Sequence, residues 1–550
     1  MKKRILYIQL TISFFILTCY GNFSEAAEEK PFRVGVYIYP YHMDMVAKSE
    51  NIPIREFIDR HFKILAENGI NGVYLGGAGP RNFDDYLYCA GKYGIALIPQ
   101  LNFAYFKGPK WTEKDMATYA EKAGEFINKY KDRPEILAWS VKEEVAHSWI
   151  NQLSRYYSMI LEYAPDAKFN LIHSNLGAAR DLPVPDPVII GTDRYAFWFE
   201  ASGGGYLASP AYALNWTRNQ AASYYPEAAK RGADYMFVVT TDAFMMFTFA
   251  NTICKTPEEL KHPVTPEEQQ QLQKRCLAYA AENRMGWRKV TTEEGDFYAF
   301  WKYYRQPGNC LKACAWTSVL EGAKLFFVYS YLTYCTKEDL EASNNIVDVI
   351  VNSCTGRKIL GRTSKGLIPW WSLAGRPGIQ NTQLAELAEA SREIRTYEKI
   401  ITKMSKIPEL TVKTETKYTF GQAFHVPTYP GVVLVLHNAN VGTWPENSRY
   451  FFRETDKIYI SDQGELMGYV PNKEPLPVVF TCPEEITRAA GKVEGMFDLK
   501  SGNEIVSADG KYTVNIKPGS GTLLFLGTRE QVAKLHELVT PSVKNNLVRE

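Results

Sequence analysis

Short apolar runs alternate with longer amphipathic stretches between residues 32 and 331. Eight of the runs combine aliphatic, β-branched and aromatic residues in the way that buried strands do. Their sequences are FRVGVYIYP (32–40), NGVYLGG (71–77), GIALIPQLNF (94–103), ILAWSVKEE (136–144), KFNLIHSN (168–175), PVIIGTDRY (187–195), YMFVVTTDAF (235–244) and KLFFVYSY (324–331). Stretches with helical periodicity lie between most of them, for instance at 54–68, 113–130 and 310–321, and another follows at 383–401. This alternation predicts βα units and a parallel sheet.

Eight βα units in succession favour an α/β protein with a (β/α)8 TIM barrel, at residues 31–405, over an open doubly wound sheet. No GxGxxG follows the first strand and no GxxxxGK[ST] is present, so the nucleotide-binding folds built on these loops are disfavoured. Enzymes with this barrel work at the carboxyl ends of its strands, so those positions are the place to look for chemistry.

The pattern changes near Thr411, where short alternating runs separated by Gly, Asn, Asp and Pro begin and continue to about residue 528. Such runs predict a small all-β sandwich domain at residues 411–528. Residues 529–550 form a polar tail with a partly helical pattern.

The N-terminal residues 1–26 have the pattern of a secretory signal peptide. Basic residues 2–4 precede an apolar stretch at 5–17, and small residues suited to cleavage follow at 24–26. We therefore expect an exported protein, periplasmic or extracellular. A lipid anchor at Cys19 is the less favoured alternative, because Thr18 is larger than the residue that usually precedes such a cysteine.

Composition and charge limit the kinds of partner and cofactor that we expect. The net charge is +2 with acids and bases interspersed, which gives no indication of a nucleic-acid or membrane-surface partner. No later stretch reaches the ~20 apolar residues of a membrane span. The nine cysteines show no CxxC and no clustered Cys/His, so we expect no metal and no cofactor. Export permits disulfides, and Cys254 and Cys276, which flank a polar insertion, are expected to pair.

Polar and aromatic side chains gather where the predicted strands end. They are Tyr39, Tyr41 and His42 after the first strand, Asn102 after the third, Glu143 and Glu144 after the fourth, His173 and Asn175 after the fifth, Asp193 and Tyr195 after the sixth, Asp242 after the seventh, and Tyr329 in the eighth, with Trp370 and Trp371 in the loop beyond it. Structural alternatives stay open for some: His173 can satisfy a strand-end carbonyl, Asp193 can belong to a buried ion pair, and Asp242 can cap a helix. The two tryptophans are expected to form a sugar platform, and the alternative that they pack their loop onto the barrel stays open.

Three stretches resemble glycoside hydrolases of clan A. AWSVKEEV (138–145) resembles their W-x-L-x-D-E-P motif after the fourth strand, VIIGTDRYAF (188–197) their D-x-Y-P stretch of strand six, and AWTSVLEGAKLFFVYSY (315–331) their seventh helix and eighth strand. The runs FDLKSGNEI (497–505) and YTVNIKPGSGTLLFLG (512–527) resemble the small terminal sandwich attached to many glycosidase barrels. The resemblance implies a carbohydrate substrate.

The resemblance also implies roles. Trp139 matches the motif's aromatic residue, Glu143 its Asp and Glu144 its Glu, the acid/base position. Val145 stands where the motif has Pro, and Asp242 where the clan's nucleophile is normally Glu. The leading hypothesis is an exported glycoside hydrolase that cleaves O-glycosidic bonds with paired carboxyls. Two alternatives stay open: a substrate-assisted, hexosaminidase-like enzyme that uses Glu143 and Glu144, and a non-catalytic carbohydrate-binding protein on a degenerate barrel.

Overall fold

The computed structural model describes most of the chain between residues 30 and 539. The described residues are 30–77, 81–101, 103, 110–144, 147–173, 176–181, 187–193, 198–199, 210–240, 242–248, 265, 267, 271, 274, 286–292, 295–306, 308–329, 331, 383–443 and 469–539. Among them, no helix is both long and apolar enough to cross a membrane.

Eight parallel strands form a barrel, in the order β3-β2-β1-β12-β8-β6-β5-β4. Their bounds are β1 Arg33–Ile38, β2 Gly72–Leu75, β3 Ala96–Pro99, β4 Trp139–Ser140, β5 Phe169–Ile172, β6 Ile189–Thr192, β8 Asp234–Thr240 and β12 Leu325–Tyr329. Parallel bridges between Leu97 and Ile136 and between Gln100 and Ser140 join β3 to β4, so the two ends of the sheet meet. Seven of the strands lie within predicted apolar runs and β8 begins one residue before its run, so the predicted (β/α)8 barrel is confirmed.

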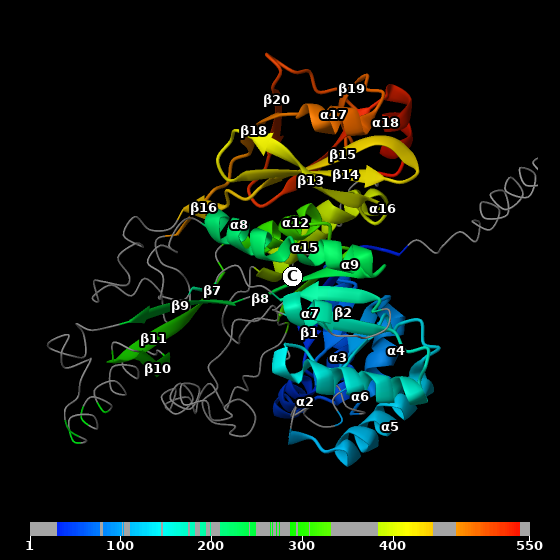
Figure 1. Ribbon diagram of the computed structural model, residues 1–550, viewed down its shortest axis with the longest axis vertical. Helices are drawn as coiled ribbons and strands as arrows, with labels where there is room; N and C mark the ends of the chain where they lie inside the picture. Colours follow the sequence, from blue (N-terminus) through cyan, green and yellow to red (C-terminus); the bar gives the residue numbers. More distant parts are fainter. Residues whose placement is uncertain are drawn as a thin grey trace, which may run out of the picture.

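Helices connect and cover the strands (Figure 1). They are α2 Pro40–Ser49, α3 Ile54–Glu67, α4 Phe83–Tyr93, α5 Glu113–Tyr130, α6 Ile150–Tyr163, α7 Leu176–Asp181, α8 Pro210–Ala221, α9 Tyr224–Lys230, α12 Cys310–Leu320, α15 Gln383–Thr396 and α16 Glu398–Ile401, with a short 3₁₀ turn at His147–Trp149. Local sequence sets several of their ends. Thr112 and Asp115 form a reciprocal capping box at the start of α5, and Gly94, at φ 66°, ends α4.

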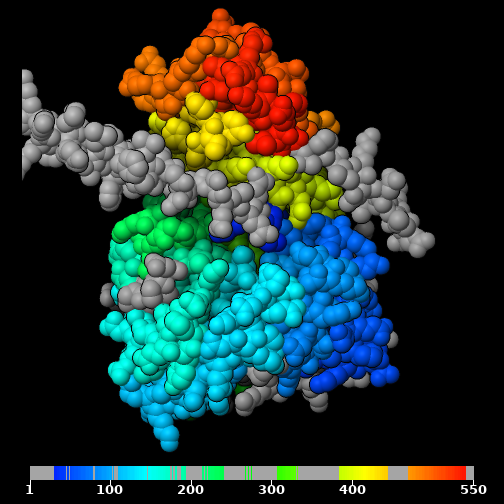
Figure 2. Space-filling model, turned by 90° about the vertical axis from the view of Figure 1, so that its right-hand side faces the viewer, coloured from blue at the N-terminus to red at the C-terminus, as the bar shows by residue number. Residues whose placement is uncertain are grey.

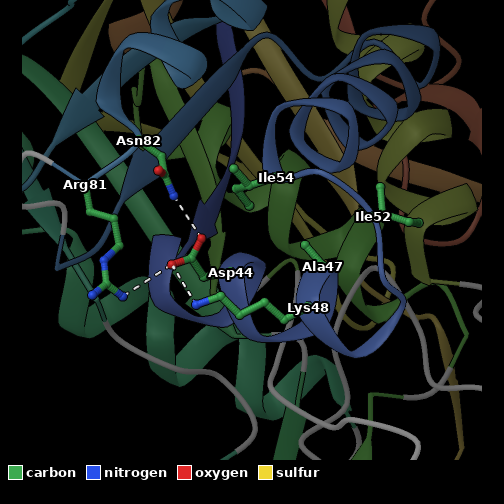
Figure 3. Close-up of a pocket in the computed structure, with 7 residues that line it drawn as sticks. All are labelled: Asp44, Ala47, Lys48, Ile52, Ile54, Arg81 and Asn82. Carbon is green, nitrogen blue, oxygen red and sulfur yellow. Dashed lines mark hydrogen bonds and ion pairs between the residues drawn. The ribbon is translucent and has the colours of Figure 1, made fainter.

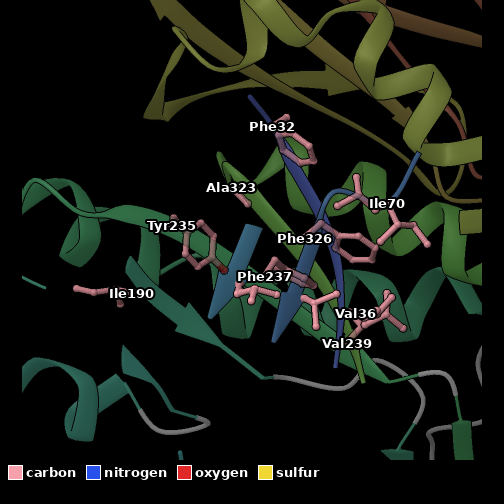
Figure 4. Packing of buried hydrophobic residues seen from close by; sticks show 14 of the residues in the cluster. Phe32, Val36, Ile70, Ile190, Tyr235, Phe237, Val239, Ala323 and Phe326 are labelled. Atoms are coloured by element: carbon pink, nitrogen blue, oxygen red, sulfur yellow. The ribbon is translucent and has the colours of Figure 1, made fainter. Parts of the chain in front are cut away.

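The barrel strands bury both faces, which is why their sequences are nearly continuous apolar runs. Residues that point inward, such as Ile98, Ile172 and Phe327, form the inner core. Their neighbours along the strands point outward and pack against the helices; Val36 and Phe326 are two of these (Figure 4).

A second sheet follows the end of β8 in the chain. It contains β7 Trp198–Phe199, β9 Asp242–Thr248, β10 Gly286–Thr292 and β11 Gly295–Arg305, in the order β10-β11-β9-β7. Asp242 opens β9 and pairs with Arg305 of β11. The alternative in which Asp242 caps a following helix is therefore wrong, because a strand follows it.

An antiparallel domain follows the barrel, as predicted. Its strands are β13 Ser405–Thr414, β14 Thr419–Val426, β15 Tyr429–Asn438, β18 Leu476–Thr481, β19 Gly495–Asp498, β20 Tyr512–Ile516 and β21 Gly521–Gly527, with a two-stranded ribbon of β16 Gly442–Thr443 and β17 Val470–Pro471 and two helices, α17 Glu484–Ala490 and α18 Arg529–His536. The seven strands have the order β19-β21-β15-β14-β13-β18-β20. β13 pairs with β14 between Ser405 and Val412 and with β18 at Lys413 and Thr414, so it joins the two layers of the domain.

Both faces of the central strand β15 are buried. Val432 and Leu434 enter the core inside the domain, whereas Val433 and Val435 join the core shared with the barrel's helices. Helices α8, α12 and α15 lie between the barrel strands and this domain, which sits on one side of the barrel (Figures 1 and 2). Every residue of α12 is buried, as expected for a helix packed on all sides.

Candidate active site at the carboxyl ends of the barrel strands

Tyrosines line the inside of the barrel beneath its carboxyl end. Tyr37 of β1 and Tyr74 of β2 are buried and stack at 4.3 Å between ring centroids. Tyr329, the last residue of β12, lies 5.7 Å from Tyr37 and 6.1 Å from Tyr39, edge to face. His42, at the start of α2, lies beside Tyr39 at 5.2 Å. The predicted residues Tyr39, His42 and Tyr329 are thus brought together.

Glycines make room for these rings. A Cβ on Gly35 or Gly72 would stand 2.4 or 2.8 Å from the ring of Phe327, and one on Gly76 would stand 2.5 Å from the ring of Tyr39. All three distances are too short for carbon atoms in contact. The small residues of the first two strands therefore permit the aromatic packing of the barrel interior.

Glu143 lies against this aromatic wall. The Tyr37 hydroxyl donates a hydrogen bond of 2.9 Å to Glu143 Oε1, and the Tyr74 hydroxyl lies within hydrogen-bond reach of the same carboxyl. Burial raises the pKa of Glu143 to about 7, although the two tyrosine hydroxyls act in the opposite direction; the nearby charge of Glu144 adds to the increase. A carboxyl with this pKa holds or releases a proton close to neutrality, as a general acid must.

Glu144 has a different environment. Its side chain is exposed, and its backbone is left-handed at φ 48°, an uncommon conformation for a residue other than glycine. The amide of Glu144 donates to the carbonyl of Ile172 in β5 at 3.3 Å. An extended chain would send the two neighbouring carboxyls to opposite sides. That argument does not apply here, because the left-handed residue turns the chain.

Asp193 supplies a third carboxyl, one residue beyond β6. It is 6% exposed, and its Oδ1 has no hydrogen-bond partner in the structure. Its side chain lies within hydrogen-bond reach of Glu144. Burial, reinforced by the charges of Glu144 and Glu143, raises the pKa of Asp193 well above its usual range. The ion pair considered as a structural alternative for Asp193 is absent among the described residues.

His173 is buried just beyond β5, and neither of its ring nitrogens has a hydrogen-bond partner in the structure. Ile172 belongs to the inner core and Leu171 to the outer core. Strand alternation therefore places His173 on the outer side, away from the inward-pointing residues. Burial lowers the pKa of His173 to about 4, so its ring is neutral. Its role in holding a substrate hydroxyl stays a prediction.

Several predicted residues lie outside the described part of the chain. They are Asn102, Asn175, Tyr195, Trp370, Trp371 and both members of the expected disulfide, Cys254 and Cys276. For Asp242 the structure describes the backbone only. Its role as nucleophile or base stays a prediction.

Tyr37 and Tyr74, which contact Glu143, are not among the residues predicted from the sequence. A signal was present: in GVY (35–37) and GVY (72–74) a glycine and a tyrosine stand two residues apart. Side chains two residues apart lie on the same face of a strand, so the glycine and the tyrosine of each GVY could have been assigned together to the barrel interior.

A surface hollow of about 390 Å³ lies beside α2 and the start of α4 (Figure 3). It is lined by Asp44, Ala47, Lys48, Ile52, Ile54, Arg81 and Asn82. The Asp44 carboxylate accepts hydrogen bonds from Arg81 at 3.2 Å and from Asn82 at 2.8 Å. These contacts tie α2 to the left-handed residue before α4, at φ 55°. None of the three carboxyls of the barrel mouth lines this hollow.

The described residues contain no group of three or more His, Cys, Asp or Glu side chains arranged to hold a metal ion. The carboxyls of Glu143, Glu144 and Asp193 lie at the same end of the barrel, and the Tyr37 hydroxyl donates to Glu143.

No protein-family model matches the chain, and neither does any curated protein. Among solved structures it is similar to a β-D-glucuronidase from Dictyoglomus thermophilum (15% identity, TM-score 0.36), covering 66% of this chain and 51% of that one. It is also similar to an α-amylase from Anoxybacillus (9% identity, TM-score 0.42; 90% and 97% covered) and to a protein described as a glycoside hydrolase (10% identity, TM-score 0.44; 91% and 94% covered). The chain spans about half the length of the glucuronidase. These are distant similarities of fold to glycoside hydrolases.

Proposed function

We propose that this protein is an exported glycoside hydrolase that cleaves the O-glycosidic bonds of a polysaccharide or oligosaccharide. The observation that carries the proposal is the cluster of Glu143, Glu144 and Asp193 at the carboxyl ends of β4 and β6. Glu143 and Asp193 have raised pKa values, and the Tyr37 hydroxyl donates to Glu143. Glycoside hydrolysis needs one carboxyl that stays protonated near neutrality and another that is ionised, and differing environments provide both.

In this proposal Glu144 delivers the proton to the departing glycosidic oxygen, because it is the exposed member of the pair. Glu143 lies behind it, fixed by Tyr37. Asp242 is the proposed nucleophile or base, a role that rests on its place after the seventh barrel strand. The tyrosines Tyr39 and Tyr329 offer aromatic faces to a sugar ring at the same end of the barrel.

The direct test is a panel of polysaccharides, incubated with the purified protein and assayed for new reducing ends. We expect at least one substrate to be cleaved, and Glu144→Gln to abolish most of that activity. Glu135→Gln is a matched control, since Glu135 precedes β4 at the other end of the barrel and pairs with Arg133 at 3.0 Å. Glycan binding without any product from the wild type would favour a non-catalytic carbohydrate-binding protein instead.

A substrate-assisted, hexosaminidase-like mechanism is the second candidate. One observation favours it: Glu143 and Glu144 are adjacent but differ in exposure, and burial raises the pKa of Glu143, so one can act as the acid while the other orients an acetamido group of the substrate. Inhibition by a thiazoline analogue, together with full activity of an Asp242→Asn variant, would support this mechanism. A lack of inhibition combined with an inactive Asp242→Asn variant would exclude it.

Export is part of the proposal and has its own test. We expect the secreted protein to begin near Ala27. N-terminal sequencing of the mature protein measures this directly. A retained Met1 would contradict export through a cleaved signal peptide.

A further inference from the structure

The carboxyls of Asp193 and Glu144 come from different parts of the barrel and meet at its mouth. Asp193 follows β6, Glu144 follows β4, and β5 lies between these strands. Two features position Glu144: its left-handed backbone, and the hydrogen bond that its backbone amide donates to the carbonyl of Ile172 in β5. Asp193 is buried, whereas Glu144 is exposed. One carboxyl of the pair is therefore shielded from solvent and the other faces it.

No cation among the described residues forms an ion pair with Asp193. The ionisable groups that act on it are Glu144 and Glu143, from the segment after β4. The neighbouring His173 of the β5 end is neutral at physiological pH. Two carboxylates within hydrogen-bond reach repel each other when both are ionised, and burial of one increases this cost. The favoured arrangement is a single proton between them.

We propose that Asp193 and Glu144 form a proton-sharing pair, in which the buried Asp193 stores the proton that the exposed Glu144 delivers to the substrate. The inference rests on the proposed function. During cleavage the pair gives its proton to the glycosidic oxygen, and the bond from that oxygen to the anomeric carbon breaks with its electrons going to the oxygen. Water adds to the anomeric carbon and gives up a proton, which returns the enzyme to its starting state.

Asp193 is a positioning residue in this scheme, because it acts through Glu144. Its unpartnered Oδ1 fits that role. A carboxyl that served only to stabilise the fold would be expected to use both oxygens, since an unsatisfied buried acceptor is costly.

The first test is the pH dependence of kcat/KM, which reports the ionisation of the free enzyme. Asp193→Asn removes the like charge and places an amide donor beside Glu144, so the barrel mouth should lose the shared proton at a lower pH. We expect the basic limb of the profile to move down by at least about one pH unit, so that kcat/KM falls at least ~10-fold at pH 7.5 and much less at pH 5. Asp193→Glu, which restores a carboxyl, should return the limb toward higher pH.

Thr192→Val is the matched control. Thr192 is the adjacent residue, equally buried, and its hydroxyl also lacks a partner, but alternation turns it to the other face of the strand. The basic limb of the kcat/KM profile of the Thr192→Val variant should stay at the wild-type pH. An Asp193→Asn enzyme that loses the same fraction of activity at every pH would overturn the proton-sharing pair.

A second test needs no catalysis. The pH dependence of the free energy of unfolding counts the protons released when the chain unfolds. Near neutral pH, the Asp193→Asn variant should release about one proton fewer on unfolding than the wild type. The Glu144→Gln variant should still release this proton, but at a lower pH, because the substitution removes the like charge beside Asp193. Glu144 is exposed, so this second variant should fold even if Asp193→Asn does not.

The outcomes separate the two proposals. If the Glu144→Gln variant released its protons on unfolding at the same pH as the wild type, the proton-sharing pair would be overturned. A wild type that shows the predicted proton release but cleaves no glycan would support the pair and overturn the proposed function.

Discussion

Buried carboxyls occur in two regions of this molecule, and their partners differ. On the side of the barrel that meets the antiparallel domain, Glu321 is fully buried between two cations. Its Oε1 accepts a 2.5 Å hydrogen bond from Arg218, and its Oε2 pairs with Lys406 at the start of β13. At the barrel mouth, Asp193 is buried beside two other carboxyls, and no cation among the described residues pairs with it.

The difference indicates what each region is for. A buried charge between two opposite charges is tolerated, and it fixes how two parts of a protein pack. A buried carboxyl beside other carboxyls destabilises the fold, so its presence indicates another role. Lys312 of α12 is another buried charge with an opposite charge beside it: it pairs with Glu389 at 2.7 Å. The ion pairs of Glu321 link the barrel to the antiparallel domain, whereas the grouped carboxyls at the mouth are the ones to which we assign proton transfer in the proposed function.

The largest expected effect is on the interface. Glu321→Ala would leave Arg218 and Lys406 without their shared partner, and breaking a buried ion pair in this way costs about 3–5 kcal/mol. We expect a loss of that size in the free energy of unfolding, measured with urea. Glu530→Ala is the control, because its partner Lys534 and Glu530 itself are exposed on α18. A Glu321→Ala variant as stable as the control would show that the two regions do not differ in this respect.

The second effect is on catalysis. Glu144→Gln should lower turnover on a natural glycan by at least ~10²-fold, the usual scale for losing a general acid. The loss should be much smaller for a substrate with a good leaving group, which needs less protonation. The midpoint of urea unfolding should stay close to that of the wild type at pH 5, below the range in which the proposed pair releases its proton. Unchanged turnover would contradict the assignment, and an inactive Glu143→Gln beside an active Glu144→Gln would move the acid by one residue.

The third effect is a pH dependence of stability from Glu143. Its pKa is raised to about 7 in the folded protein, so its contribution is present below about pH 4.5 and is lost as pH rises through 7. Each pKa unit is worth 1.36 kcal/mol, and since the side chain is partly exposed we expect a loss of about 2 kcal/mol. Unfolding with urea at pH 5 and pH 8 measures it. Glu143→Gln should lose less stability than the wild type over this range; an equal loss would place the titration elsewhere.

The sequence predicted the barrel well because its signals are local. Each apolar run became a strand, and the periodicity at 113–130 matched α5, Glu113–Tyr130. The strand ends also identified Glu143, Glu144, Asp193 and Tyr329 as candidates. Position after a strand, however, did not show that Asp193 and Glu144 come into contact, because this depends on strand order in a closed barrel. The left-handed backbone at Glu144 was equally hidden, since glutamate carries no preference for it.

The smallest expected effect tests the hydrogen bond between Tyr37 and Glu143 at the barrel mouth. Tyr37→Phe removes the hydroxyl that donates to Glu143 at 2.9 Å. A hydrogen bond to the ionised form stabilises that form, so its loss should raise the pKa of Glu143 above about 7, by roughly one unit. The pH range over which stability falls should move upward by the same amount, measured by urea unfolding across pH 5 to 9. Tyr86→Phe is the matched control, because Tyr86 is as deeply buried and its hydroxyl has no hydrogen-bond partner in the structure. If both variants left the range unchanged, Tyr37 would not set the protonation of Glu143, and the tyrosines would serve only to pack the barrel.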